Sequence, residues 1–442
     1  MKFRSLISTC SATICTATDD DTITSTQKSH PLQPKLFFSD TSSSPSLDTS
    51  YSHSYSSSLN SNLSLQTLPS VPSLQKLSPE TLNLVISHNY LTSIKPTPTA
   101  HVNFLAVHNH RLYAASGNLI HVFDTNMFVL LDVFSVNDLS SGSIKSVMFH
   151  NGNVFTSHQD SKIRVWKLTE NKRHKHAATL PTLEDRLLRS VLSKNYVNVR
   201  RHRRRLWIEH HDAVSGLAAV NDQFMCSVSW DKYLKIWKTS NFRCVESIKA
   251  HDDAINTVVV AVDGTIYTGS ADRRIKVWGK PVGEMKHGLI ATLEKHKSAV
   301  NALAINKDGS VLFSGACDRS ILVWEKEDSA NHMAVAGALR GHSKAILCLI
   351  NVSNLLFSGS ADRTVRIWQR GPEGKFCCLT VLDGHRQPVR SLVADSDSYE
   401  SESASTIIKV FSGSFQGEIK IWKVVISNIA SPMSRHVHKL KL

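Results

Sequence analysis

The sequence predicts an all-β protein: one ring of four-stranded sheets that follows a disordered tail. The first observation is a recurring pattern of a Ser/Thr/Gly stretch, an Asp, alternating residues, and a Trp six positions after the Asp. The clearest copies are SVSWDKYLKIW (227–237), TGSADRRIKVW (268–278), SGACDRSILVW (314–324) and SGSADRTVRIW (358–368). The second observation is the spacing, with Trp-to-Trp steps of 41, 46, 44 and 54 residues between 237 and 422. Repeats of about 40 to 45 residues with period-two alternation are typical of propeller blades. The sequence therefore predicts a single seven-bladed β-propeller.

Three further copies complete the set of seven. TSHQDSKIRVW (156–166) keeps the pattern, SGSFQGEIKIW (412–422) has Gln416 in place of the Asp, and ASGNLIHVF (115–123) ends in Phe123. One such sheet has two apolar faces and cannot stand alone, so the sheets are expected to stack radially. The last sheet then needs an outer strand from elsewhere. TLNLVISHNYL (81–91), which precedes the first copy, is the expected donor.

The regions outside the repeats have a different composition. Residues 1 to about 80 are dominated by Ser, Thr, Pro and Asn, which cannot bury enough apolar surface to offset the entropy of ordering. We expect a disordered tail at 1–80, the propeller at 81–425 and a C-terminal tail at 426–442. Two insertions interrupt the propeller: a basic one at 169–205 and an acidic, serine-rich one at 395–406.

Composition argues against membrane, secreted and metal-binding proteins. No apolar run approaches the roughly 20 residues of a membrane helix. The hydroxyl-rich start, followed by three aspartates at 19–21, does not resemble a targeting peptide. The eight cysteines show neither pairing nor metal-ligand spacing and are expected to be reduced and structural. We therefore expect a protein of the cytoplasm and nucleus with no metal and no cofactor.

The order of strands within a repeat assigns each turn to a face of the ring. SIKAHDDAINTVVVAVDGTIYTGSADRRIKVW (247–278) predicts an outer strand, a His turn, an inner strand, a middle strand, an Asp turn and a Trp strand. Alternate turns of such a meander lie on the same side. The His and Asp turns therefore share one face, called here the top face. The connections that follow each Trp lie on the opposite, bottom face.

These repeats resemble those of the WD-repeat family, and the resemblance covers residues 82–425. In that family a His imidazole bridges the turn Asp to a Ser or Thr hydroxyl, which meets the indole N–H of the Trp. The resemblance implies this structural role for four complete sets: His210–Ser227–Asp231–Trp237, His251–Thr268–Asp272–Trp278, His296–Ser314–Asp318–Trp324 and His342–Ser358–Asp362–Trp368. The first two repeats have Pro98 and Ser140 in place of the His, and the seventh has His385 but no Asp. We expect no catalytic site and no enzyme activity.

The top face is expected to carry a partner-binding surface. Basic residues follow the turn Asp in four repeats, and aromatic residues precede the Asp position in two. The residues of this surface are Trp230, Lys232, Arg273, Arg274, Arg319, Arg363 and Phe415. Arginine binds carboxylates and phosphates through paired hydrogen bonds, and aromatic residues beside it are common at interfaces. The surface is therefore interpreted either as a docking site for an acidic or phosphorylated segment or as an ordinary solvated rim.

The basic insertion contains a predicted helix. The stretch PTLEDRLLRSVL (181–192) has an apolar side that is expected to lie against a blade edge, made of Leu183, Leu187, Leu188, Val191 and Leu192. Asp185 follows Thr182 by three residues, as in a capping box, which predicts where the helix begins.

An arginine run follows this helix and consists of Arg200, Arg201, Arg203, Arg204 and Arg205. The next residues, RLWIEH (205–210), are expected to form the outer strand of a blade, which would place the run at the bottom face. Together with KRHKH (172–176), the run is interpreted as an import signal or a docking patch. Nucleic-acid binding, with stacking on Trp207 and Tyr196, is the alternative, and the absence of a recognition motif disfavours it.

Three segments also resemble the plant JINGUBANG-like branch of the WD-repeat family: TLPTLEDRLLRSVLSKNYVNVRR (179–201), HHDAVSGLAA (210–219) and AHDDAINTVV (250–259). This resemblance implies a plant regulatory protein that binds other proteins, transcription regulators among them. We therefore predict a non-catalytic, monomeric interaction platform for signalling or transcription-regulatory partners. The alternatives are a nucleic-acid-associated protein and a substrate receptor of a ubiquitin ligase. The residues after each repeat Trp do not match the ligase-docking pattern.

Overall fold

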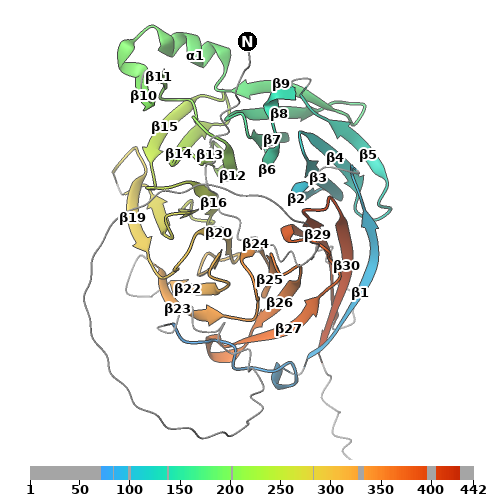
Figure 1. Cartoon of the computed structure of the whole chain (residues 1–442). Helices are drawn as coiled ribbons and strands as arrows, with labels where there is room; N and C mark the ends of the chain where they lie inside the picture. The colour runs from blue at the N-terminus through green and yellow to red at the C-terminus, as the bar shows by residue number, and fades with distance from the viewer. Residues whose placement is uncertain are drawn as a thin grey trace, which may run out of the picture.

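The computed structural model describes residues 71–82, 84–97, 101–136, 139–200, 203–281, 283–326, 333–395 and 405–428. Within this part of the chain, the strands form seven four-stranded antiparallel sheets arranged as a ring, with one two-stranded sheet outside it (Figure 1). The predicted all-β, seven-bladed propeller is thereby confirmed. The expected disorder of residues 1–70 and the C-terminal tail beyond 428 lie outside the described residues.

Each of blades 1 to 6 takes four consecutive strands, the inner strand first and the outer strand last. Blade 1 comprises β2 (Val102–His108), β3 (Arg111–Ser116), β4 (Leu119–Asp124) and β5 (Leu130–Phe134). Blade 2 comprises β6 (Ile144–His150), β7 (Asn153–His158), β8 (Ile163–Leu168) and β9 (His174–Leu180). Blade 3 comprises β12 (Val214–Asn221), β13 (Phe224–Ser229), β14 (Tyr233–Lys238) and β15 (Cys244–Lys249). Blade 4 comprises β16 (Ile255–Val260), β17 (Ile266–Ser270), β18 (Ile275–Gly279) and β19 (Gly288–Leu293).

The second half of the ring closes on the first. Blade 5 comprises β20 (Val300–Ile305), β21 (Val311–Ala316), β22 (Ile321–Lys326) and β23 (Met333–Leu339). Blade 6 comprises β24 (Ile346–Val352), β25 (Leu355–Ser360), β26 (Val365–Arg370) and β27 (Phe376–Leu382). Blade 7 comprises β28 (Val389–Asp395), β29 (Ser405–Ser414), β30 (Ile419–Asn428) and β1 (Leu84–Ile94). The single-turn helices are η2 (Glu80–Leu82), η3 (Leu139–Ser141), η4 (Ser193–Asn195) and η5 (Pro372–Gly374).

Strand β1 closes the ring by pairing with the last strand of the chain. Its register with β30 runs from Leu84 opposite Asn428 to Ile94 opposite Ile419. The TLNLVISHNYL segment is therefore the outer strand that the last repeat lacked, as expected. The inner strands β28 and β2 also contact each other, so the two ends of the repeat array meet both at the axis and at the rim (Figure 1).

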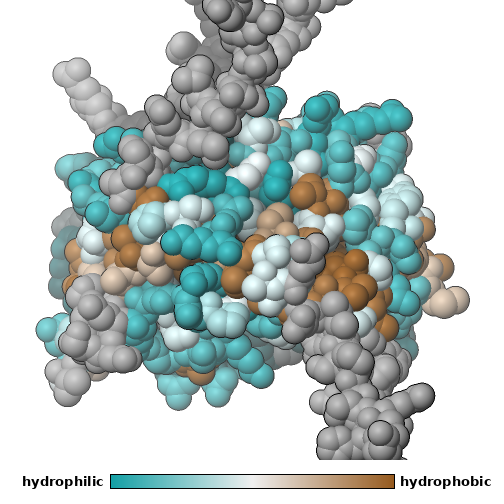
Figure 2. Space-filling model, turned by 90° about the horizontal axis from the view of Figure 1, so that it is seen from below, coloured by the Kyte–Doolittle hydropathy of each residue, from teal (hydrophilic) through white to brown (hydrophobic). Residues whose placement is uncertain are grey.

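The hydrophobic core lies between neighbouring sheets. At the junction of blades 4 and 5, for example, Ile275 packs with Leu312 and Trp324, and all three are buried. Burial is greatest in the second strand of a blade: β21 is buried along its whole length, whereas the inner strand β16 is mostly half-buried and the outer strand β5 alternates between buried and exposed residues. Figure 2 views the ring edge-on: on the side shown, hydrophobic residues form a band across the middle, and hydrophilic residues lie above and below it.

Residues 71–82 form a strap across the outside of blades 5 and 6, which corrects the expected boundary of the tail at residue 80. Ser73 bridges to Ala338 and Gln75 bridges to Phe376, both in parallel orientation. Val71 is 3% exposed and joins the core between blades 4 and 5. The strap has little helix or sheet periodicity of its own, because isolated bridges to blades 5 and 6, and not a continuous ladder, hold it.

The basic insertion lies elsewhere than predicted. HKHAATL (174–180), counted within the insertion, forms β9, the outer strand of blade 2. Because one edge of an outer strand faces solvent, this strand needs few apolar residues, and its basic composition concealed it. RLWIEH (205–210) is not an outer strand: its first residues end β11 (Arg203–Leu206), which pairs with β10 (Tyr196–Arg200) in a separate hairpin. The insertion therefore leaves from the outer strand of blade 2 and returns at the His turn of blade 3.

Helix α1 (Leu183–Ser190) lies in this insertion, on the outside of the ring next to β15 (Figure 1). The side chain of Thr182 accepts a hydrogen bond from Asp185 N at 3.2 Å, as the capping box predicts. The predicted orientation is wrong, however, because the apolar side of the helix faces solvent and Asp185 faces the ring. The acidic insertion joins β28 to β29, and its residues 396–404 lie outside the described part of the chain.

No helix within the described residues is long and apolar enough to cross a membrane.

Candidate functional site

Four sets of buried polar residues lie at the top of blades 3 to 6. In each set, His Nδ1 lies 2.8 Å from an Asp oxygen and His Nε2 lies 2.8 Å from a hydroxyl oxygen. The Trp Nε1–H donates to the same hydroxyl over 2.8–3.0 Å. These are the four predicted sets that begin with His210, His251, His296 and His342. Because the polar atoms already have partners within the set, the arrangement ties the Asp turn to the Trp strand and leaves no free nucleophile.

The carboxylates in these sets are held in their ionised form, because the pKa of each is lowered. Burial acts to raise the pKa of Asp231 and Asp272, but the paired histidines and backbone N–H groups outweigh it and lower each pKa to about 2. Burial also lowers the pKa of His210, so its imidazole is neutral and donates from Nδ1 to the ionised Asp231. An ionised carboxylate beside a neutral imidazole fits a structural clamp.

Blade 2 builds a similar contact with a histidine that the repeat pattern did not reveal. His158 Nε2 lies 2.8 Å from Thr156 Oγ1, and Trp166 Nε1–H donates to the same hydroxyl over 2.9 Å. Asp160 pairs instead with Arg164 at 2.6 Å. The repeat lacks a histidine at Ser140, as predicted, but it has one two residues after the hydroxyl. The T-S-H order at 156–158 was the available signal.

Blade 7 lacks the acid of the set. His385 Nε2 lies 2.7 Å from Ser412 Oγ, and Trp422 Nε1–H donates to that oxygen over 2.9 Å. Gln416 stands at the Asp position, and among the described residues His385 Nδ1 has no hydrogen-bond partner. The seam of the ring is thus held by fewer polar contacts than its middle.

Three of the seven residues predicted for the top face line one cavity. Trp230, Arg273 and Phe415 belong to a wall that encloses about 1080 Å³ at the top of the central channel. The remainder of this wall comes from the inner strands and from the His and Asp turns of the blades. The described residues of the wall include four Lys or Arg and a single acid, Asp253. The cavity is therefore basic.

The other four predicted residues lie outside this wall: Lys232, Arg274, Arg319 and Arg363. Lys232 Nζ donates to the carbonyl oxygen of Asp252 at 2.6 Å. Arg274 pairs with the Asp252 carboxylate at 3.4 Å and with Glu294 at 2.6 Å. Part of the predicted positive ring is thus neutralised on the side of blades 3 and 4.

In each of blades 3 to 6, the residue directly after the turn Asp has a left-handed backbone. The φ angles are 77°, 72°, 69° and 75° at Lys232, Arg273, Arg319 and Arg363. Gly417 occupies the equivalent place in blade 7 with a φ of 80°. Glycine is the residue that this conformation favours. The turn geometry alone therefore does not explain why four of these positions carry long cations.

Two further cations enter the cavity from inner strands, and sequence reasoning missed both. Lys145 of β6 places Nζ 5.1 Å from the centre of the Trp230 ring, and the Arg390 guanidinium of β28 lies 5.1 Å from the centre of the Phe415 ring. Burial, followed by the nearby Arg390 charge, lowers the pKa of Lys145 to about 8. Burial also lowers the pKa of Arg390. No carboxylate of the described residues offsets either charge.

The signal for these cations was their position in the strand. The second residue of every inner strand lines the cavity: Asn103, Lys145, Ser215, Asn256, Asn301, Leu347 and Arg390. Strand alternation predicts that these positions share one side. Only the closed ring brings Lys145 and Arg390, 245 positions apart in the chain, into electrostatic contact.

The predicted basic patch lies in hairpin β10–β11, beside α1 on the outside of the ring (Figure 1). Arg201 and the side chains of Arg200 and Arg203 lie outside the described residues. Arg204 is exposed, and Arg205 donates to the carbonyl oxygen of His210 at 3.2 Å.

Of the two aromatic residues predicted to stack on bases, Tyr196 is exposed but Trp207 is covered. Trp207 lies under the Arg189 guanidinium, 4.6 Å from the centre of the indole ring, and its carbonyl oxygen accepts a hydrogen bond from the buried Lys235. The His210–His211 doublet gains no further ligands, since the described residues contain no group of three or more His, Cys, Asp or Glu arranged to hold a metal.

Comparison with known proteins agrees with this geometry. Residues 203–238, 242–279, 288–325, 334–369 and 376–423 match the family model described as WD domain, G-beta repeat. These matches correspond to blades 3 to 7, whereas blades 1 and 2 are recognised from their strand order in the ring. The matched ranges include all four of the complete hydrogen-bonded sets.

Two fungal relatives share part of this repeat array. A 128-residue stretch is 27% identical to the probable cytosolic iron-sulfur protein assembly protein 1 of Kluyveromyces lactis, and it covers 27% of this chain and 38% of that protein. An 89-residue stretch is 34% identical to an uncharacterized WD repeat-containing protein of Schizosaccharomyces pombe, over 20% of this chain and 22% of the relative. The chain thus spans well under half the length of these relatives, so the likeness concerns repeats.

WD-repeat propellers act as scaffolds for protein interactions and are typically non-catalytic. Both the hydrogen-bonded sets and the seven-bladed ring fit that description, because they stabilise turns and present a rigid face. The matched repeats, the similar proteins and the closed ring together show that this chain belongs to the WD-repeat family.

Proposed function

We propose that this protein is a non-catalytic interaction platform that binds an acidic or phosphorylated segment of a partner at the mouth of its channel. The observation that carries the proposal is the pair Lys145 and Arg390, which lie in the cavity against aromatic rings without a carboxylate partner. Both side chains are partly buried, and a cation partly withdrawn from water without a counter-ion is unfavourable. An incoming carboxylate or phosphate would offset that cost.

The remaining top-face residues support the same partner chemistry. Trp230 and Phe415 offer aromatic surface beside the two cations, which suits apolar side chains that flank an anionic group. Arg273 adds a charge to the cavity wall. Around it, Arg319 and Arg363 provide an outer zone that attracts anions before they bind, whereas Lys232 and Arg274 are engaged by Asp252 and Glu294.

The test measures binding of the full chain to two fluorescein-labelled peptide pools by fluorescence anisotropy. Both pools are 11 residues long and randomised except for a central residue, which is phosphoserine in one pool and serine in the other. We expect the phosphoserine pool to bind at least tenfold more tightly. Lys145→Met and Arg390→Met should each weaken its binding by about 1.5–3 kcal/mol, the value of a hydrogen bond to a charged group. Equal binding of the two pools would contradict the proposal.

Two matched variants separate the cavity from the outer zone. Arg273→Gly and Arg363→Gly each remove one cation from the same left-handed turn position, so neither strains the backbone. We expect Arg273→Gly to weaken binding severalfold and Arg363→Gly to change it by less than about twofold. Because the pKa of Lys145 is lowered to about 8, wild-type affinity should also fall as the pH rises through 8.

We further propose that the protein is a plant regulator of the cytoplasm and nucleus that holds signalling or transcription-regulatory partners as a monomeric propeller. The resemblance of residues 179–201, 210–219 and 250–259 to the JINGUBANG-like branch supports this, and the arginine run supports nuclear import. Nucleic-acid binding is the weaker candidate because Trp207 is covered by Arg189. A pull-down from plant tissue with and without nuclease separates the two, because protein partners lost only with nuclease would favour the nucleic-acid alternative.

A further inference from the structure

Helix α1 is held to the ring by its polar side. Asp185 is 2% exposed, and its carboxylate accepts hydrogen bonds from Cys244 N at 3.4 Å and from Arg189 Nε at 2.8 Å. Arg189 in turn donates to the carbonyl oxygen of Cys244 at 3.2 Å and lies over the Trp207 ring. The two side chains thus engage both backbone groups of the first residue of β15. Because these contacts are buried and directional, they determine which side of the helix faces outward.

The outward side is a continuous apolar stripe, called here the α1 stripe. Its members are Leu183 (75% exposed), Leu187 (68%), Leu188 (59%), Val191 (81%) and Leu192 (49%). Spacings of three and four residues bring them together on one side of the helix and the turn that follows it. A helix that turns Asp185 and Arg189 inward and its leucines outward forgoes the burial that normally stabilises it. Exposed apolar clusters of this kind mark interaction sites.

The surroundings of the stripe are positively charged. Residues 181–209 contain eight Lys or Arg and three Asp or Glu. Each of these acids is already in an ion pair: Glu184 with Arg243 at 2.6 Å, Asp185 with Arg189 at 2.8 Å, and Glu209 with Arg186 at 2.9 Å. Lys194 and Arg204 are exposed beside the stripe and the hairpin. The stripe is therefore bordered by cations without exposed, unpaired carboxylates among the described residues of the insertion.

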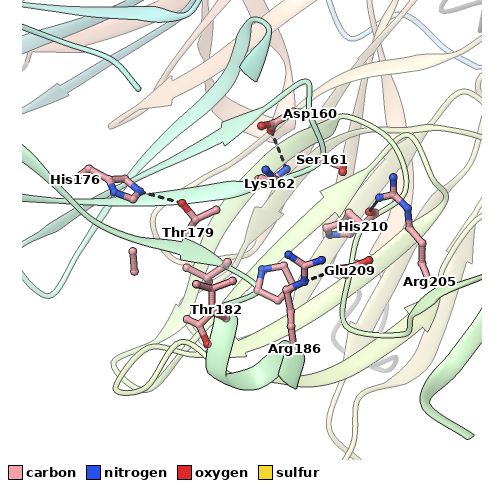
Figure 3. A pocket seen from close by; sticks show the side chains of 14 residues that line it. Asp160, Ser161, Lys162, His176, Thr179, Thr182, Arg186, Arg205, Glu209 and His210 are labelled. Carbon is pink, nitrogen blue, oxygen red and sulfur yellow. Dashed lines mark hydrogen bonds and ion pairs between the residues drawn. The ribbon is translucent and has the colours of Figure 1, made fainter. Parts of the chain in front are cut away.

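A pocket of about 740 Å³ opens at the start of the stripe, between α1 and blade 2. Leu180 and Leu183 give it an apolar wall, and its charged lining consists of Lys162, Arg186 and Arg205 with two acids, Asp160 and Glu209, that are already paired with Arg164 and Arg186. Figure 3 shows Arg186 reaching Glu209, with Arg205 on the same side near His210. The pocket can take an anchoring side chain of whatever lies along the stripe.

We propose that the α1 stripe, with hairpin β10–β11 and this pocket, docks an amphipathic helical segment of a partner protein whose apolar side is edged by Asp and Glu. The apolar stripe supplies the contact area, and the surrounding cations select acidic edges. A second copy of this chain is a poor occupant because its own stripe carries the same positive border. Residues 1–70 are a poor occupant because they carry four Lys or Arg and five Asp or Glu and are thus nearly neutral. This site is separate from the channel mouth and does not depend on the function proposed there.

The test uses the full chain and three fluorescein-labelled 18-residue peptides in anisotropy titrations. One peptide is an amphipathic helix with leucines on one side and glutamates at its edges, the second replaces each glutamate by lysine, and the third is a scrambled form of the first. We expect the acidic amphipathic peptide to bind at least tenfold more tightly than either of the others. Its affinity should fall as salt concentration rises.

Protein variants locate the binding surface. Leu187→Ser/Leu188→Ser and Lys194→Glu/Arg204→Glu should each weaken binding of the acidic peptide at least tenfold. Leu130→Ser is the matched control, since Leu130 is 53% exposed on the outer strand of blade 1, and it should leave binding unchanged. All of these side chains are exposed, so circular dichroism and thermal unfolding should stay at wild-type values.

Three outcomes overturn the proposal. The first is equal binding of the acidic and basic peptides, or binding that survives the Leu187→Ser/Leu188→Ser change. The second is self-association of the wild type, measured by light scattering, that this double variant abolishes, because the stripe would then be a contact between copies. The third is peptide binding that appears only after deletion of residues 1–70, because the tail would then be the occupant.

Discussion

At the scale of single residues, the propeller depends on hydroxyl groups that each serve two buried partners. Ser314 Oγ accepts the Trp324 indole N–H at 2.8 Å and lies 2.8 Å from His296 Nε2. All three side chains are buried, so water cannot replace the hydroxyl without opening the blade. The value of this serine lies in preventing two buried polar atoms from being left without partners.

We predict that Ser314→Ala lowers the free energy of unfolding by about 2–4 kcal/mol, because it strands an indole N–H and an imidazole nitrogen. Urea denaturation followed by tryptophan fluorescence measures the change. Ser343→Ala is the control, because Ser343 is exposed on the neighbouring His turn, and its effect should be under about 0.5 kcal/mol. Similar losses in both variants would show that the hydroxyl bridge is not the source of stability.

At the scale of elements, the strap of residues 71–82 shows how a segment without periodicity is held. Leu74 N donates to the Ala338 carbonyl at 3.1 Å, and Phe376 N donates to the Leu74 carbonyl at 2.8 Å. The strap can approach blade 5 only because Gly337 has no side chain. A Cβ at that position would lie 2.5 Å from Leu74 Cγ.

We predict that Gly337→Ala loosens the strap and costs about 1–3 kcal/mol, the usual cost of overpacking. Limited trypsin digestion should then cut faster after the exposed Lys76. Gly288→Ala, in the outer strand of blade 4, is the control, because the nearest atom to its new Cβ would be 3.7 Å away. If both variants are cut at the wild-type rate, the strap is not held by this close approach.

At the scale of the whole molecule, the ring keeps histidines neutral that would take up protons in the unfolded chain. Burial, then the charges of Arg164 and His176, lowers the pKa of His158 to about 3. Burial and the Lys420 charge lower the pKa of His385 to about 4. Both imidazoles belong to the incomplete sets, in blades 2 and 7, and burial also lowers the pKa of His211, in the His turn of blade 3, to about 4.

We predict that stability falls as the pH drops from about 6.5 to 4. Over that range the unfolded chain binds protons at these two positions and the native ring does not, so each contributes a loss of up to about 1.4 kcal/mol per pH unit. Below pH 4 a further loss should follow as Asp231 and Asp272, whose pKa values are about 2, take up protons. Urea unfolding at pH 7, 6, 5 and 4.5 measures the slope, and His158→Gln/His385→Gln should make it less steep, with the remainder due to other buried histidines such as His211. A pH-independent wild type would refute the assignment.

The sequence predicted what local periodicity encodes. Alternating apolar residues with a Trp at fixed spacing predicted the blades, and the missing outer strand of the last repeat predicted the role of β1. It did not predict β9, because an outer strand with a solvent-facing edge needs few apolar residues. Nor did it predict His158, which reaches the hydroxyl of blade 2 from an unexpected position.

By itself, the sequence determined a WD-repeat ring and its hydrogen-bonded sets, because each blade's burial pattern and turn chemistry lie within about 45 consecutive residues. Only the tertiary structure decided where the binding surfaces lie. Closure of the ring brings Lys145 near Arg390, and the backbone of Cys244 captures Asp185 and Arg189, which turns the leucines of α1 outward. Both results depend on contacts between residues far apart in the chain, and a local periodic pattern cannot predict such contacts.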